Sequence, residues 1–291
     1  GRIAFTTDSY VVTPIFFPGG DIGELAVNGT INDLAVGGAR PLALSMAFIL
    51  EEGLPMNDLR RVINSARDAA ARAGVPIVTG DTKVVGKGSG DKIFINTSGI
   101  GVVPAGVDLS SRFIAPGDVV ILSGTVGDHG ATIMCQREAL ALEAGGALRS
   151  DTAALHELCA AILDACPRVH AMRDPTRGGL AAVLVEIATR NCLGIDFDER
   201  AVPVNASVRA VCELFGLDPL LLANEGKLVA FVPADDAAAA LGAMRAHPLG
   251  RDAAVIGRVT ADASGLVTAR TPLGGRRILD LPYAEPLPRI C

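Results

Sequence analysis

Apolar residues follow two rhythms in the first hundred positions, one typical of strands and one typical of helices. Short apolar runs predict strands, and apolar residues spaced three or four positions apart predict helices. The expected elements are strand 2–7, helix 21–39, strand 42–50, helix 57–73, strand 76–85 and strand 92–103. Asn57 is expected to cap the second helix and Gly74 to end it. This order predicts a compact βαβαββ-like unit.

A second unit begins with the apolar strand 118–124, after a probable boundary at 108–118. Further strands are expected at 194–197, 227–232, 254–259 and 266–269, and helices at 129–143, 151–165, after Gly178-Gly179, at 205–215 and at 235–246. Both units mix strands and helices, so the predicted class is α/β, with an N-terminal sheet domain and an α+β C-terminal domain. The expected division is 1–107, 108–280 and a tail, 281–291.

The tail ends in a cysteine, Cys291, after three prolines in seven residues (Pro282, Pro286 and Pro288). Proline fixes φ and removes a backbone donor, so helix and central strand are both disfavoured. In an extended polyproline-like form, ten residues span about 30 Å. Two interpretations are open: a flexible arm that carries a reactive thiol, or a frayed terminus that happens to end in cysteine.

Composition narrows the function classes. The net charge of −6 disfavours a nucleic-acid or anionic-membrane surface, which needs clustered positive charge. No apolar run approaches the roughly 18–20 residues that cross a bilayer. The six cysteines form no Cys-x-x-Cys pair and no zinc spacing, which favours a cytoplasmic protein. Cys135, Cys159 and Cys212 lie in apolar helical patterns and are expected to be small buried residues.

Four polar clusters interrupt the apolar pattern, where burial is costly unless each polar group has a partner. They are Thr6–Ser9, Gly29–Asp33, Thr79–Lys83 and Arg173–Gly179. Their oxygen atoms suit Mg²⁺, and glycines before a helix allow backbone amides to approach a phosphate. Each cluster alone is also common turn chemistry. Since neither a Walker A sequence nor a Rossmann glycine motif is present, ATP binding would require an uncommon nucleotide fold.

Six motifs together carry a resemblance to a known family. They are Phe17-Pro-Gly-Gly-Asp-Ile-Gly23, Asn32-Asp-Leu-Ala-Val-Gly-Gly-Ala-Arg-Pro41, Gly80-Asp-Thr-Lys-Val-Val85, Gly127-Asp-His-Gly130, Arg173-Asp-Pro-Thr-Arg-Gly-Gly-Leu180 and Pro288-Arg-Ile-Cys291. The chain resembles the HypE family of hydrogenase maturation proteins, within the aminoimidazole-ribonucleotide synthetase and selenophosphate synthetase superfamily. The resemblance runs nearly end to end. It implies an aminoimidazole-ribonucleotide-synthetase-like fold, a homodimer formed through the N-terminal sheet, and ATP with Mg²⁺ bound near the domain junction.

The resemblance also implies a reaction on the tail. A partner carbamoyltransferase, HypF, would load Cys291 as an S-carboxamide. ATP would phosphorylate the amide oxygen, and loss of an N–H proton would expel phosphate and leave a thiocyanate. The cyanide would then pass to the HypC–HypD complex, which carries the iron of NiFe-hydrogenase.

Metal and phosphate binding is expected at the polar clusters. Asp8, Asp33 and Asp81 are the candidate metal ligands, and Asn32 is expected to help organise the phosphates. Lys83 is the candidate for neutralising phosphate charge, ahead of Lys87.

Other residues are candidates for proton transfer and for phosphate binding. Glu225 is the first candidate for the base, and His129 is the second because its ordinary pKa of about 6.5 suits proton transfer. Arg177 and the Gly178-Gly179 turn are candidates for clamping phosphate.

Family members carry a glycine-rich segment and an Asp-Asp motif before the position equivalent to Gly1, and the given sequence includes neither. We therefore expect ATP turnover by this chain alone to be impaired. Two other functions fit the sequence: a superfamily synthetase or kinase acting on a free small molecule such as selenide, and a docking dimer without nucleotide chemistry.

Overall fold

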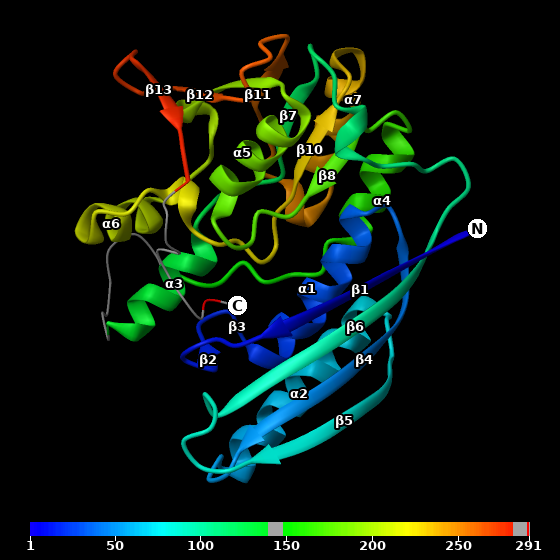
Figure 1. Ribbon diagram of the computed structural model, residues 1–291, viewed down its shortest axis with the longest axis vertical. Coiled ribbons are helices and arrows are strands. Elements are labelled where there is room, and N and C mark those ends of the chain that lie inside the picture. Colours follow the sequence, from blue (N-terminus) through cyan, green and yellow to red (C-terminus); the bar gives the residue numbers. More distant parts are fainter. Residues whose placement is uncertain (139–147, 282–289, 291) are drawn as a thin grey trace.

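The computed structural model describes residues 1–138, 148–281 and 290. In the N-terminal half, α1 and α2 cover one face of a four-stranded sheet with the order β1-β6-β4-β5 (Figure 1). The elements are β1 (Arg2–Tyr10), β2 (Phe16–Phe17), β3 (Gly20–Asp21), α1 (Ile22–Val36), β4 (Arg40–Glu51), α2 (Met56–Ala73), β5 (Ile77–Val85) and β6 (Ile93–Val103). The predicted βαβαββ order is thus confirmed. The β4–β5 pair is parallel, and β6 runs antiparallel to both β1 and β4.

The C-terminal half is built on a seven-stranded sheet, in the order β13-β12-β9-β11-β7-β10-β8. Its strands are β7 (Val119–Leu122), β8 (Ala171–Arg173), β9 (Gly194–Asp198), β10 (Val229–Val232), β11 (Ala254–Thr260), β12 (Val267–Arg270) and β13 (Arg276–Leu279). Its helices are α3 (Asp128–Arg137), α4 (His156–Ala165), α5 (Gly179–Asn191), α6 (Ala206–Phe215) and α7 (Ala237–Ala246). The predicted mixed α/β class is therefore confirmed.

The central strand β7 is an unbroken apolar run because both of its faces are covered. Val120 and Leu122 pack into a core with α5, whereas Val119 and Ile121 pack into a core with α4 and α7. A strand that is covered on both faces needs apolar residues at every position rather than at alternate ones.

Several predicted helix starts differ from the observed ones. The second helix begins at Met56 with Pro55 as its N-cap, and Asn57 lies inside the first turn. The carbonyl of Pro55 accepts the N–H groups of Asp58 and Leu59, and no side chain caps this helix. The predicted end is correct, because Gly74 adopts a left-handed conformation with φ of 66°.

The helix predicted at 151–165 begins only at His156. The five residues before it are held outside helical geometry because their polar groups bond to other segments. The N–H of Leu155 donates to the side chain of Asn32, and the N–H of Ala153 donates to the carbonyl of Glu225. The helix predicted at 129–143 begins at Asp128, and its last predicted residues lie outside the described part of the chain.

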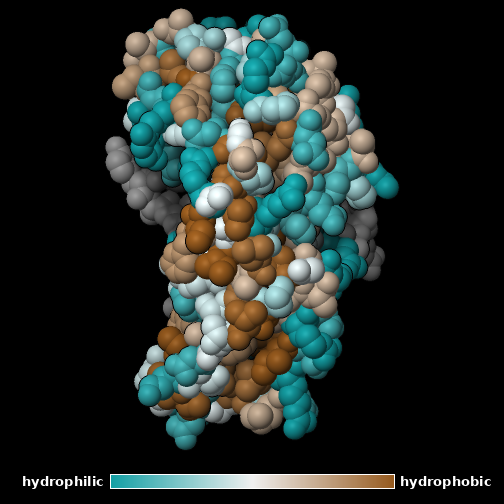
Figure 2. Space-filling model, turned by 90° about the vertical axis from the view of Figure 1, so that its right-hand side faces the viewer, coloured by the Kyte–Doolittle hydropathy of each residue, from teal (hydrophilic) through white to brown (hydrophobic). Residues whose placement is uncertain are grey.

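No helix of the described residues covers the outer face of the N-terminal sheet. Large apolar side chains are exposed there, among them Ile3, Phe5, Ile49 and Ile100, and Phe5 is 67% exposed. Figure 2 shows brown, hydrophobic residues gathered in a band over the lower half of this side of the molecule. A sheet face this apolar is typical of a surface covered by a partner.

The two halves share one core. Residues of α1 and α2 pack in the same apolar cluster as Ile133 of α3, Val208 of α6 and Ile290 near the chain end. Cys135, Cys159 and Cys212 are buried in apolar surroundings, as predicted. Among the described residues, no helix is both long and apolar enough to span a bilayer.

Candidate active site

Glu225 lies in the loop before β10, at the junction of the two halves. Its side chain is buried, and its Oε1 atom has no hydrogen-bond partner in the described part of the chain. Burial, followed by the negative charges of Asp151, Asp174 and Asp8, raises the pKa of Glu225 well above its ordinary value, against the opposing charge of Arg177. The predicted base is therefore a strongly basic carboxylate once its proton is lost.

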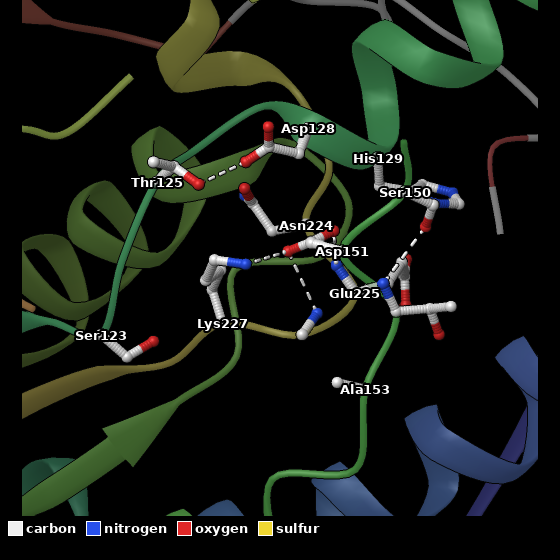
Figure 3. Close-up of polar contacts among 12 residues, drawn as sticks. Ser123, Thr125, Asp128, His129, Ser150, Asp151, Ala153, Asn224, Glu225 and Lys227 are labelled. Atoms are coloured by element: carbon white, nitrogen blue, oxygen red, sulfur yellow. Dashed lines mark hydrogen bonds and ion pairs between the residues drawn. The ribbon is translucent and has the colours of Figure 1, made fainter. Parts of the chain in front are cut away.

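Residues 150–155, which we call the strap, run alongside this loop. Asp151 Oδ1 accepts the N–H of Glu225 at 3.0 Å, and its Oδ2 accepts the N–H of Gly226 at 3.2 Å and Lys227 Nζ at 3.0 Å (Figure 3). One carboxylate thus holds three consecutive residues of the Glu225 loop.

His129, at the start of α3, connects the strap to the end of the chain. Its Nδ1 lies 2.8 Å from Ser150 Oγ, and its Nε2 lies 2.8 Å from the carbonyl oxygen of Ile290. Because a carbonyl can only accept, Nε2 carries the proton and the neutral Nδ1 accepts from Ser150. Burial lowers the pKa of His129, which agrees with a neutral ring. Both nitrogens are occupied in this arrangement, which favours Glu225 over His129 as the base.

Ile290 is the last described residue of the chain. Its side chain is 3% exposed and packs in the core shared by the two halves. Cys291, the predicted thiol carrier, lies outside the described residues, as do the tail prolines.

Asp33, on α1, faces a cavity of about 630 Å³ between the two halves. Its Oδ2 accepts the hydroxyl of Thr6 at 2.8 Å. Burial and the nearby Asp174, with a smaller effect of Asp8, raise the pKa of Asp33 to about 6. The cavity is also lined by three arginines, Arg112, Arg173 and Arg190. Carboxylates that repel one another beside arginines form a surface suited to a cation bound to phosphates.

Asn32 is engaged by backbone groups of the opposite half. Its Nδ2 donates to the carbonyls of Ala153 and Glu225, at 3.0 and 3.3 Å, and its Oδ1 accepts the N–H of Leu155 at 2.7 Å. The side chain is almost completely buried. Its geometry is that of a brace between α1, the strap and the Glu225 loop.

Asp81 and Lys83 lie apart from Asp8 and Asp33 within one chain. Both stand on β5, which is separated from β1 by β4 and β6, a span of about 14 Å at the usual strand spacing. Lys83 pairs in register with Ile49, an exposed residue of the outer face, and directly paired residues point to the same face. Asp8 pairs with the fully buried Thr97, so it lies on the helix side of the sheet.

The Arg177-Gly178-Gly179 turn opens α5. Gly178 and Gly179 both have positive φ, 71° and 62°, and a Cβ on Gly179 would contact the carbonyl oxygens of Leu220 and Leu222. These glycines therefore serve close packing as well as any phosphate. Arg177 is exposed and near enough to Glu225 to oppose the rise in its pKa.

A metal centre is not preformed in the part of the chain that the structure describes, since no three His, Cys, Asp or Glu residues there are close enough to hold an ion. Asp33 and Asp174 fit the mode in which Mg²⁺ binds one or two carboxylates and takes its other ligands from phosphates and water.

Sequence reasoning did not assign Asp151, Asn224 or Lys227. Asn224 Oδ1 accepts the N–H of Gly127, and its Nδ2 donates to the carbonyl of Pro175, so it joins two of the quoted motifs. Asn224 and Lys227 flank the predicted base, which was an available signal. Nothing in the sequence distinguishes Asp151 from other aspartates that precede a helix.

Comparison with known proteins decides the family. Residues 1–103 match the N-terminal domain, and residues 115–269 the C-terminal domain, of AIR synthase related proteins. The carbamoyl dehydratase HypE of Azotobacter vinelandii is 56% identical over 291 residues, which cover all of this chain and 85% of the relative. The chain belongs to the HypE family.

Two solved HypE structures have the same fold. Hydrogenase maturation protein HypE in complex with ATP matches with a TM-score of 0.95 at 50% identity, over all of this chain and 88% of that one. A HypE–HypF complex matches with a TM-score of 0.92 at 50% identity, over 96% of this chain and 90% of that one. The predicted resemblance to HypE and the predicted two-unit fold are confirmed.

Proposed function

We propose that this protein is an ATP-dependent carbamoyl dehydratase that converts an S-carboxamide on Cys291 into a thiocyanate, which supplies a cyanide ligand during hydrogenase maturation. Membership of the HypE family supports this function. Among the structural features, the one that supports it most is the buried Glu225, whose backbone N–H is linked through the strap and His129 to the backbone of Ile290. The residue after Ile290 in the sequence is Cys291.

The reaction consists of two transfers. The amide oxygen of the carboxamide attacks the γ-phosphorus of ATP, an N–H proton leaves, and ADP departs. Glu225 then takes the remaining N–H proton, the C–O bond breaks, phosphate leaves, and the C≡N bond forms. The oxygen of the carboxamide ends in phosphate, so no free water is produced. A carboxyl whose ionised form is disfavoured by burial is a strong base for the second step.

The proposed nucleotide site is the cavity between an N-terminal domain, 1–107, and a C-terminal domain, 108–280. Asp33, Asp174 and Asp8 would hold Mg²⁺, which neutralises phosphate charge when it is bound. The cavity arginines and Arg177 would bind phosphate oxygens.

A homodimer formed through the outer sheet face is part of the proposal. The exposed apolar side chains of this face support it, as does the position of Asp81 and Lys83 on the same face, away from Asp33 of their own chain. In a dimer these two residues are available to the site of a second copy.

The proposed partners are HypF, which loads Cys291, and the HypC–HypD complex, which accepts the cyanide. The solved complex of a similar HypE with HypF supports the first partner. The proposed setting is the cytoplasm.

The test is a single-turnover assay on the full-length protein carbamoylated at Cys291. ATP and Mg²⁺ are added, and conversion of the carboxamide to the thiocyanate is followed by mass spectrometry of the C-terminal peptide. Glu225→Gln is expected to slow conversion about 10²- to 10⁴-fold while ATP binding persists. Cys291→Ala is expected to abolish loading. Thiocyanate forming at another cysteine in the Cys291→Ala protein refutes the proposal.

A further inference from the structure

Both backbone groups of Glu225 are tied to the strap. Asp151 accepts its N–H at 3.0 Å, and the N–H of Ala153 donates to its carbonyl at 3.2 Å. The carboxyl is different, because Oε1 has no hydrogen-bond partner within the described residues. The loop is thus fixed at the backbone, and the side chain is left with an unused acceptor at the site.

The anchor of this arrangement is a buried ion pair. The side chains of Asp151 and Lys227 are 6% and 13% exposed, and Oδ2 and Nζ are 3.0 Å apart. Burial alone raises the pKa of Asp151, but Lys227 and the N–H of Glu225 outweigh it, so the net pKa lies below the ordinary value. Asp151 is therefore ionised at pH values where the neighbouring Glu225 carboxyl still holds its proton, and pKa values separated in this way give two carboxyls different roles.

The contact leaves no room for adjustment at the residue after Glu225. A Cβ on Gly226 would overlap the backbone oxygen of Asp151, so strap and loop touch at the main chain. Ser150, the neighbour of Asp151, bonds His129, which holds the Ile290 carbonyl. Figure 3 shows Asp151 between Lys227 and the Glu225 loop, with Ser150 and His129 on the other side.

We infer that Asp151 is a positioning residue for the proposed dehydration: it fixes the Glu225 loop in register with the docked chain end and presents its own negative charge to the Glu225 carboxyl. This inference rests on the proposed function, because it concerns the base of that reaction. The other charged and titratable groups that face Glu225 are Asp8, Asp174, Arg177 and Tyr10, and none of them is changed in the test.

The test uses the same single-turnover assay across a range of pH. The informative protein is the double variant Asp151→Asn/Lys227→Gln, which keeps a hydrogen-bonding pair and leaves no unpaired buried charge. We expect its maximal rate to fall about 10- to 100-fold, since small misplacements of a catalytic group have effects of this size. We also expect the rising limb of its pH–rate profile to move to lower pH, because a negative charge beside Glu225 is gone.

Asp151→Glu separates the two contributions. It keeps the charge but lengthens the side chain, so the rate should fall with a smaller movement of the pH profile. Asp252→Asn is the matched control, because Asp252 is exposed and lines the same small cavity as Asp151 and Lys227. Within the described residues it makes no hydrogen bond or ion pair to the Glu225 loop. It should behave as the unchanged protein does.

The outcomes distinguish this inference from the proposed function. If the unchanged protein forms no thiocyanate, the proposed function fails. If it does, and the folded double variant matches it in rate and pH profile, only the role of Asp151 is refuted. A slower double variant with an unmoved pH profile refutes the electrostatic part and shows Asp151 to be a structural brace.

Discussion

Replacing Asn32 distinguishes its predicted role as a phosphate-organising residue from the role of a structural brace that its contacts indicate. Its side chain is 2% exposed and makes three hydrogen bonds to backbone groups of the opposite half. In Asn32→Ala the N–H of Leu155 and the carbonyl of Ala153 lose these partners, whereas the carbonyl of Glu225 keeps the N–H of Ala153. Each buried polar group left without a partner costs about 1–3 kcal/mol, so the loss of two partners should lower the free energy of unfolding by about 2–6 kcal/mol.

The assay is urea denaturation followed by far-ultraviolet circular dichroism, since the chain has no tryptophan. Asn28→Ala is the graded control, because Asn28 lies on the same helix and makes one bond to the strap, to Thr152 Oγ1 at 3.2 Å. Its expected cost is about 1 kcal/mol. ATP affinity, measured by calorimetry, should change little in folded Asn32→Ala. Unchanged stability together with weakened ATP binding would refute the brace and restore Asn32 as a phosphate-organising residue.

Three further changes test other parts of the site. The pKa of Asp33 is raised to about 6, so its contribution to stability is complete below its unfolded pKa near 4 and is lost as pH rises through 6. Ligand-free Asp33→Asn should therefore be more stable than the unchanged protein by about 1–3 kcal/mol at pH 8 and equally stable below pH 4. Melting temperatures across this pH range test this. Ile290→Ala should slow thiocyanate formation about tenfold without slowing loading, since burial of an isoleucine contributes about 1.5–3 kcal/mol to docking; equal effects on both steps contradict this. Phe5→Glu should convert a dimer to a monomer in light scattering, and a monomeric unchanged protein contradicts the proposed interface.

Local patterns were enough to predict most of the fold. The apolar rhythm predicted every strand of the N-terminal sheet, and Gly74 marked the end of α2 correctly. The largest error fell where long-range bonds replace local ones. The strap was predicted as helix because its sequence alone does not reveal that Asn32 and the Glu225 loop bind its backbone. The error at the start of α2 is a local one, since Pro55 is the N-cap and no side chain caps the helix.

The candidate site was predictable to the extent that its residues stand next to one another in motifs. Glu225 was predicted from its place before a strand and is buried at the junction. A single metal site formed by Asp8, Asp33 and Asp81 stays a prediction. One chain does not bring the three residues together, because Asp81 on β5 and Asp8 on β1 lie at opposite edges of the sheet. Strand order and facing cannot be read from spacing, since β4 and β6 intervene between the two edges.

By itself the sequence determined the elements, the mixed class and the HypE resemblance, because periodicity and contiguous motifs are local properties of a chain. Tertiary structure decided what each polar residue bonds to. It paired Asp151 with Lys227, gave His129 the carbonyl of Ile290, and left the Glu225 carboxyl with an unpartnered oxygen among the described residues. The reason is physical: a side chain's protonation and role depend on burial and on neighbours that the fold brings together from distant positions.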